Sequence, residues 1–147
     1  MTDYEVRQVS GESDLTHAHA VRRAVFIEEQ GVAEAIEMDD KDEEAIHVVV
    51  SDPEAEMAVG TARLRIPRAG VGKAERVAVR SVYRGEGLGT LLMEWLEEEA
   101  RDQGCSEMSL HAQTAVKEFY EKLGYIVVSD EFEEAGIPHV EMKKSLD

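Results

Sequence analysis

A glycine-rich junction between a strand-like segment and the strongest helical segment constrains this 147-residue chain most. Residues 74–79 have the length and composition of a strand, and residues 90–103 repeat apolar side chains at helical spacing before Gly104. The segment that joins them, YRGEGLGT at 83–90, has glycines at alternate positions. A strand, a helix and a further strand in succession require parallel neighbours in one sheet. The junction therefore favours an α/β fold.

The remaining segments also have the patterns of strands and helices, which gives the expected order of elements along the chain. Antiparallel hairpins dominate the first half of the chain and strand-helix-strand crossovers the second half. We therefore expect a mixed, mostly antiparallel sheet of about six or seven strands, flanked by helices on both faces. The strands are predicted at 4–9, 45–50, 57–66, 74–79, 106–111, 125–128 and 139–142, the helices at 13–29, 90–103 and 114–123, and a solvated acidic connection at 32–44.

The charge balance excludes several classes of partner. The chain has 32 Asp and Glu against 16 Lys and Arg, a net charge of −16. Nucleic acids and anionic membrane surfaces both select basic proteins, so neither is an expected partner. A charge of this size favours a halophilic, salt-rich cytoplasm in which self-repulsion is screened, with an ordinary acidic protein as the alternative.

Length and residue usage predict one domain, 1–147, in the cytoplasm. No apolar run reaches the roughly 18–20 residues of a membrane span, and the first residues lack the pattern of a secretory signal. Cys105 is the single cysteine, which excludes an internal disulfide, and we expect a buried thiol rather than a nucleophile. No metal site is expected, because His17 and His19 do not share a helix face and the acidic segment lacks the EF-hand glycine.

The alternating glycines favour an anion-binding site. They allow the backbone to approach a ligand closely, and the start of the following helix directs free N–H groups at it. A phosphate or diphosphate is the expected ligand. A P-loop is excluded because no lysine precedes Thr90, and a dinucleotide fingerprint is excluded by the spacing of the glycines. A flexible loop at a helix entry is the alternative interpretation.

Two motifs then resemble a known family. Arg84-x-x-Gly87-x-Gly89 after the strand ERVAV resembles the acetyl-CoA signature of the GNAT N-acetyltransferase superfamily. One helix and one strand later, FYEKLGY at 119–125 resembles the F-Y-x-K-x-G-F/Y segment of the same superfamily. Three shorter segments are similar to its ElaA-like branch, FIEEQGV at 26–32, HAQ at 111–113 and GIPHV at 136–140. The resemblance covers essentially the whole chain.

The resemblance implies a GNAT fold splayed between strands 4 and 5, with acetyl-CoA as co-substrate in the splay. Pantetheine would then lie along the backbone of Val77, Ala78 and Val79, with the Val79 N–H as an oxyanion donor. Gln113 stands where many relatives have a shorter Asn, and Phe119 belongs to the cofactor side. The diphosphate would bind the N–H groups of Gly85, Glu86, Gly87, Leu88, Gly89 and Thr90, with its charge offset by Arg84, Arg80, Lys117 and Lys122.

The second motif supplies the expected proton donor. Tyr120 would protonate the departing thiolate, with a core aromatic as the alternative role. The acceptor must lose a proton before attack, and Glu75 is our candidate base, with His111 and His139 as further candidates. Each of these three side chains also has a purely structural interpretation. Glu28 and Glu29 either attract a cationic amine or form a solvated helix end.

The expected activity is therefore acetyl transfer from acetyl-CoA to a primary amine, by direct attack in a ternary complex without a metal. A non-catalytic acyl-CoA sensor on the same fold and a nucleotide-binding domain are the alternatives. The sequence does not identify the acceptor amine, and it leaves a homodimer open.

Overall fold

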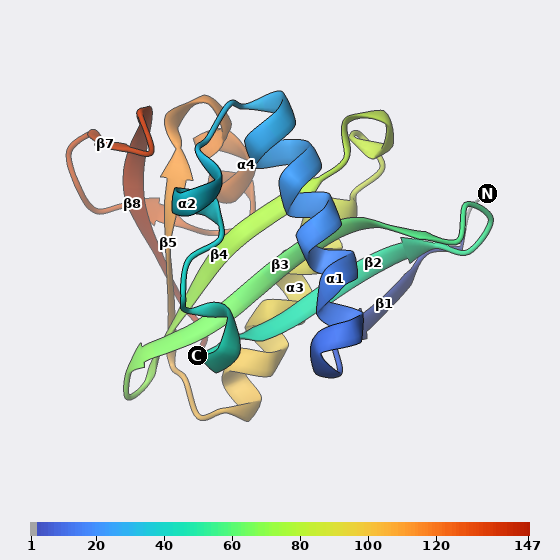
Figure 1. The fold of residues 1–147 in the computed structure, drawn as a ribbon. Coiled ribbons are helices and arrows are strands. Elements are labelled where there is room, and N and C mark those ends of the chain that lie inside the picture. The colour runs from blue at the N-terminus through green and yellow to red at the C-terminus, as the bar shows by residue number, and fades with distance from the viewer. Residues whose placement is uncertain (1–2) are drawn as a thin grey trace.

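The computed structural model describes residues 3–147 as an eight-stranded sheet with helices on both faces (Figure 1). Every predicted strand and helix is present. The sheet gains one unpredicted short strand, β7, beside the last predicted strand. In chain order the elements are β1 (Glu5–Gln8), α1 (Gly11–Arg22), η1 (Arg23–Glu29), α2 (Glu34–Glu37), η2 (Asp42–Glu44), β2 (Ile46–Asp52), β3 (Met57–Arg68), β4 (Val71–Val79), η3 (Ser81–Tyr83), α3 (Leu88–Asp102), β5 (Glu107–Gln113), η4 (Thr114–Val116), α4 (Lys117–Lys122), β6 (Ile126–Val127), β7 (Phe132–Glu134) and β8 (Ile137–Ser145).

The sheet opens between its two parallel strands. Its order is β1-β2-β3-β4-β5-β8-β6, with β7 paired to β8, and the β4–β5 pair is parallel while the others are antiparallel. Pairing of β4 with β5 runs from Val71↔Glu107 to Ala74↔Leu110 and stops there. The upper halves of the two strands therefore diverge, as the resemblance implies, and leave room for a ligand between them.

A β-bulge in β4 lies where the strands begin to diverge. Thr61 of β3 pairs with Ala78 and Arg63 pairs with Glu75, so β4 has one residue more than β3 over this stretch. Arg76 takes up the extra length with a left-handed backbone, φ +54°. Because a bulge bends its strand and increases the local twist, it helps to turn the end of β4 away from β5.

The two faces of the sheet are covered by different helices. In Figure 1, α1 crosses one face and α3 lies behind the other. The apolar side of α3, with Leu88, Leu92 and Leu96, is buried in the main core against β2–β5. A smaller cluster packs Ala18 and Val21 of α1 against the opposite face. The predicted first helix continues beyond α1 as a π-helical segment, η1, which carries its end over the opening of the sheet.

The acidic connection after this helix is only partly solvated. Asp40, Glu43 and Glu44 are exposed, as predicted, but Glu37 is buried and Asp39 and Asp42 are partly buried. Arg63 of β3, at 1% exposure, donates to Asp39 and Asp42 at 2.8 Å each. The fully buried Arg22 donates to Glu37 and, at 2.7 Å, to Asp42. Burial alone would raise the pKa of Asp42, but its hydrogen bonds with both arginines outweigh this and hold the pKa at about 2. The connection is therefore fastened to α1 and β3 by buried ion pairs.

Two further predictions concern the chain as a whole. Cys105 is buried, as expected, and burial raises the pKa of its thiol. Within residues 3–147, the helices are all too short or too polar to cross a bilayer.

Candidate active site

A cleft of about 860 Å³ fills the space between the separated ends of β4 and β5. Its walls come from η1, the acidic connection, the second half of β4, the glycine loop, the end of β5, α4 and the β7–β8 turn. Among the backbone and loop residues predicted to bind the cofactor, Glu86 alone does not line the cleft. The predicted site residues that do line it are Glu75, Val77, Ala78, Val79, Arg84, Gly85, Gly87, Leu88, Gly89, Thr90, Gln113, Phe119 and Tyr120.

The glycine loop presents unused hydrogen-bond donors to this cleft. Within residues 3–147, the backbone N–H groups from Gly85 to Thr90 donate to no backbone acceptor, and no side chain caps α3. Gly85 and Gly87 have φ +86° and +80°, a left-handed backbone that other residues adopt only with strain. Consecutive free N–H groups at the start of a fifteen-residue helix form a binding site for an anion.

The two sequence motifs meet beside this loop. A Cβ atom on Gly89 would lie 3.0 Å from Cζ of Phe119, so a larger residue would fit only if the ring shifted. Phe119 in turn packs edge-on against Tyr120, with ring centroids 4.9 Å apart. The anion site and the candidate proton donor are therefore connected through one aromatic contact.

Tyr120 belongs to the main core and also lines the cleft. Its ring is buried, at 8% exposure, and packs edge-on with Tyr125 as well as Phe119. Its hydroxyl has no hydrogen-bond partner among residues 3–147, yet it is not sealed off from solvent, because the residue lines the cleft. Burial raises the pKa of Tyr120, so the phenol is fully protonated at neutral pH.

The end of η1 is bonded to both walls of the cleft. Arg84 donates to the Glu29 carboxylate at 2.6 and 2.7 Å, and its Nε donates to the Val79 carbonyl at 3.0 Å. Gln113 of β5 donates to the side-chain oxygen of Gln30 at 2.9 Å. The Arg84 hydrogen bond holds the pKa of Glu29 below its usual value. Glu29 is therefore an exposed helix end whose carboxylate is paired with Arg84 rather than free for a cationic acceptor.

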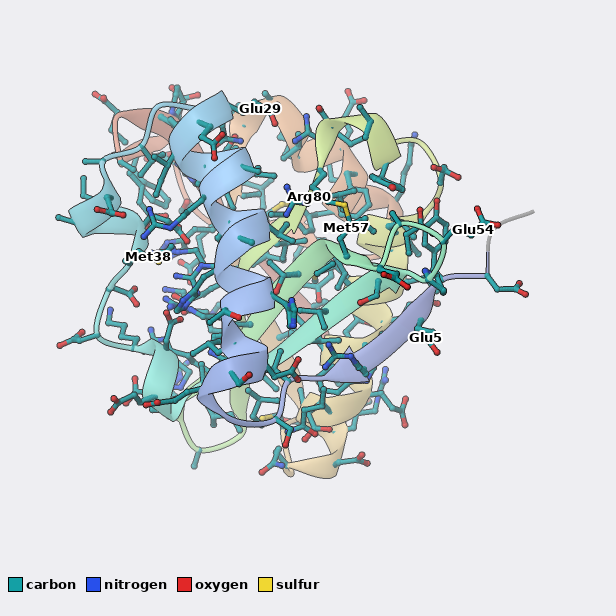
Figure 2. The ribbon with its side chains drawn as sticks, turned by 45° about the vertical axis from the view of Figure 1, so that its right-hand side comes forward. Glu5, Glu29, Met38, Glu54, Met57 and Arg80 are labelled. Carbon is teal, nitrogen blue, oxygen red and sulfur yellow. The ribbon has the colours of Figure 1, made fainter. Side chains whose placement is uncertain are left out.

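The other predicted cations do not line the cleft. The Nε of Arg80 donates to the Ala58 carbonyl at 2.9 Å. Arg80 faces a separate hollow of about 520 Å³ that Met57 and Glu29 also line, beside the helical segment labelled at Glu29 in Figure 2. Lys117 and Lys122 of α4 are absent from the lining as well. Of the four predicted cations, Arg84 is thus the one placed at the cleft.

Glu75 is held in ion pairs, which makes it a weak base. Its carboxylate lies 2.7 Å from Nε of Arg65, 3.1 Å from Arg63 and 3.4 Å from Lys73. Burial alone would raise the pKa of Glu75, but Arg65, Arg63 and Lys73 outweigh it and bring the pKa to about 2. A carboxylate with this pKa has little tendency to take a proton from an ammonium group.

The two candidate histidines share a carboxylate that the sequence analysis did not identify. Glu134 lies 2.9 Å from Nδ1 of His111 and 3.7 Å from Nε2 of His139, and all three residues line the cleft. Its position follows from the tight turn EAG, in which Ala135 and Gly136 both have positive φ. No group of three or more metal-binding side chains is found within the described residues 3–147.

Comparisons with known proteins find relatives of this chain and of its fold. The family model described as an acetyltransferase (GNAT) domain matches residues 7–146. The uncharacterized N-acetyltransferase YjcF of Bacillus subtilis is 43% identical over 134 residues, which cover 90% of this chain and 94% of YjcF. The structure of Escherichia coli ElaA has a TM-score of 0.82 at 26% identity, covering 98% and 99% of the two chains. An aminoglycoside 6'-N-acetyltransferase complexed with coenzyme A shares the fold, with a TM-score of 0.75 at 19% identity and 97% of each chain covered.

Proposed function

The chain belongs to the GNAT acetyltransferase family, and from that premise we propose that it transfers the acetyl group of acetyl-CoA to a primary amine by direct attack in a ternary complex. The observation that carries this proposal is the run of unpaired N–H groups from Gly85 to Thr90 at the end of the cleft. These donors suit the diphosphate of a coenzyme A thioester. The neighbouring structure with coenzyme A bound supports the same ligand.

Acetyl-CoA would bind with its diphosphate on the glycine loop and its pantetheine along the backbone of residues 77–79. Glu86 would contribute its backbone N–H alone, since its side chain does not line the cleft. The Val79 N–H is our candidate donor to the oxyanion of the tetrahedral intermediate. The Arg84 guanidinium would release the Glu29 carboxylate and donate to the phosphate oxygens instead, which offsets the charge of the diphosphate.

Tyr120 would act as the general acid. When the carbon–sulfur bond breaks, the electron pair goes to sulfur, and the thiolate takes the phenolic proton. Burial raises the pKa of Tyr120, and burial beside it would also destabilise the thiolate, so the raised pKa does not oppose the transfer strongly. The pKa values of the phenol and of the thiol therefore remain close enough for the proton to transfer.

We further propose that residues 1–147 act as one domain in the cytoplasm and that the net charge reflects a halophilic origin. Formation of a homodimer is an additional proposal. The acceptor side of the cleft carries charges of both signs, from Asp39, Lys41, Lys73, Arg76 and Glu134.

A thiol-release assay tests the proposal. Purified protein is titrated with acetyl-CoA by calorimetry and is then incubated with acetyl-CoA and a panel of primary amines, with acetylated products identified by mass spectrometry. We expect saturable binding and amine-dependent release of coenzyme A. Binding without turnover of any amine would instead support the acyl-CoA sensor, and no binding by folded protein would contradict both functions.

A further inference from the structure

The proposed reaction also needs a proton acceptor. A candidate lies at the apex of the cleft, by which we mean the point where β4 and β5 part. His111 follows Leu110, the last residue of β5 that pairs with β4, just as Glu75 follows Ala74 on β4. Both side chains therefore lie where the two strands part, and both line the cleft. Glu75 is neutralised by three cations, whereas the imidazole of His111 has one acidic partner.

The partner of His111 fixes which ring nitrogen carries the proton. Nδ1 of His111 lies 2.9 Å from Oε1 of Glu134. The hydrogen bond from His111 lowers the pKa of Glu134, so this carboxylate is ionised at neutral pH and can only accept. Nδ1 therefore carries a hydrogen, and in the neutral imidazole the lone pair is on Nε2. Nε2 has no hydrogen-bond partner among residues 3–147.

The surroundings hold the pair in place. Phe132 packs edge-on against the imidazole of His111, with ring centroids 5.1 Å apart. On the other side of Glu134, Nε2 of His139 lies 3.7 Å from Oε2, and its Nδ1 donates to the Ile137 carbonyl at 2.7 Å. Phe132, Glu134 and His139 all belong to the β7–β8 hairpin, so one hairpin orients the imidazole of His111.

We propose that His111 is the general base of the acetyl transfer and that Glu134 is its positioning residue. This inference rests on the proposed function and extends it to the acceptor side. An ammonium ion bound at the apex gives one proton to Nε2, and the freed lone pair attacks the thioester carbonyl carbon. Collapse of the intermediate breaks the carbon–sulfur bond, and sulfur takes the proton of Tyr120. The acetylated nitrogen returns its extra proton to the Tyr120 phenolate, and the imidazolium releases its own to water.

The geometry also predicts which substrates need the base. An alkylamine is an ammonium ion at neutral pH, whereas hydroxylamine is uncharged and needs no deprotonation before attack. Loss of the base at His111 should therefore lower kcat strongly for alkylamines and only slightly for hydroxylamine. Other charged groups face the imidazole or line the cleft with it, and they also shape the pH profile. They are Glu134 of β7, His139 and Glu141 of β8, Lys73, Glu75 and Arg76 of β4, Arg84 of the glycine loop, Glu37 of α2, and Asp39 and Lys41 of the acidic connection.

The activity test uses H111Q and E134Q, with E133Q as the matched control on the same strand. We expect H111Q to lower kcat for an alkylamine about 100-fold, to change kcat for hydroxylamine less than about threefold, and to leave acetyl-CoA affinity unchanged. E134Q should lower kcat for the alkylamine about tenfold and alter its pH profile, while E133Q behaves as wild type. Equal losses of H111Q toward both nucleophiles, or no loss toward either, would overturn the proposal.

A second measurement does not depend on finding an acceptor. In 15N-labelled protein, long-range proton–nitrogen spectra report the tautomer of each neutral histidine, and the H111Q spectrum identifies the His111 signals. We expect hydrogen on Nδ1 of His111 in the wild type, with that preference reduced in E134Q. Hydrogen on Nε2 would refute the dyad, even where acetyl-CoA binds and the proposed function stands. Failure to bind acetyl-CoA, with the Nδ1 tautomer intact, would refute the function instead.

Discussion

Gly89 and Phe119 touch across the cleft, so closely that a Cβ atom on Gly89 would lie 3.0 Å from Cζ of the ring. Gly89 belongs to the loop of free N–H groups, and Phe119 precedes the candidate acid Tyr120. The contact explains how two short motifs, separated by a helix and a strand, form one site. It also shows why the last glycine of the loop is needed although its backbone φ is not positive.

Replacing Gly89 with alanine should therefore disturb the site. The new methyl group must displace the Phe119 ring, and overpacking of this kind costs about 1–3 kcal/mol. We expect G89A to lower the melting temperature and to weaken acetyl-CoA binding about tenfold in calorimetry. Adding F119L should recover part of both losses by making space. If G89A binds acetyl-CoA as wild type does, the close packing of the two motifs does not shape the site.

The Tyr120 assignment predicts a selective loss of turnover. Y120F keeps the ring in its aromatic contacts and removes the proton, so kcat should fall about 100-fold while acetyl-CoA affinity stays constant. Y125F is the matched control. The Tyr125 hydroxyl donates to Glu97 at 2.8 Å and does not line the cleft, so its loss should affect stability and spare kcat. Undiminished kcat in Y120F would show that the thiolate is protonated by another group.

Glu29 competes with the ligand for Arg84. Both terminal nitrogens of Arg84 are bonded to the Glu29 carboxylate, and the pair is exposed. Exposed pairs are worth about 0.2–1 kcal/mol, so E29Q should strengthen coenzyme A binding by up to about fivefold. E28Q serves as the control, because Glu28 is one residue earlier and makes no ion pair with Arg84. Weaker coenzyme A binding by E29Q would mean that the Glu29–Arg84 ion pair helps to form the binding site rather than competing with the ligand.

The ion pairs of Glu75 should appear in the acid stability of the protein. Its pKa is about 2 in the folded state against a usual 4.5, so the unfolded chain binds the proton more readily. The stabilisation from this group, roughly 3 kcal/mol, is complete above pH 5 and is lost as the pH falls toward 2.

Urea unfolding of wild type, E75Q and the exposed control E133Q between pH 7 and pH 3 measures this effect. E75Q should be less stable than wild type at pH 7, and the difference should shrink on acidification. A difference that stays constant across this range would contradict the ion-paired state of Glu75.

The sequence predicts local elements and local motifs well, because both depend on neighbouring residues. The helical spacing of Leu88, Leu92 and Leu96 and the alternate glycines each identify their own structure. Ion pairs between residues far apart in the sequence could not be predicted from such local patterns. Arg63 and Asp39 are 24 residues apart, and a run of acids gives no sign of which arginine it will meet.

The apex of the cleft shows the same limit. His111 was recognised as a candidate base, but Glu134 was not, because its position depends on a short strand, β7, that pairs with β8 after a tight turn. A three-residue strand is too short to give an alternating pattern. The turn residues EAG were the remaining signal, and they indicate a hairpin without indicating what its side chains contact.

The central claim is that the N–H groups of residues 85–90 hold the diphosphate of coenzyme A, and amide chemical shifts test it most directly. In proton–nitrogen spectra of 15N-labelled protein, titration with coenzyme A should move the amide signals of Gly85, Gly87 and Gly89 strongly. Pantetheine, which lacks the diphosphate, should leave those signals in place and move those of residues 77–79. Saturable binding of coenzyme A without any shift of the loop amides would contradict the account.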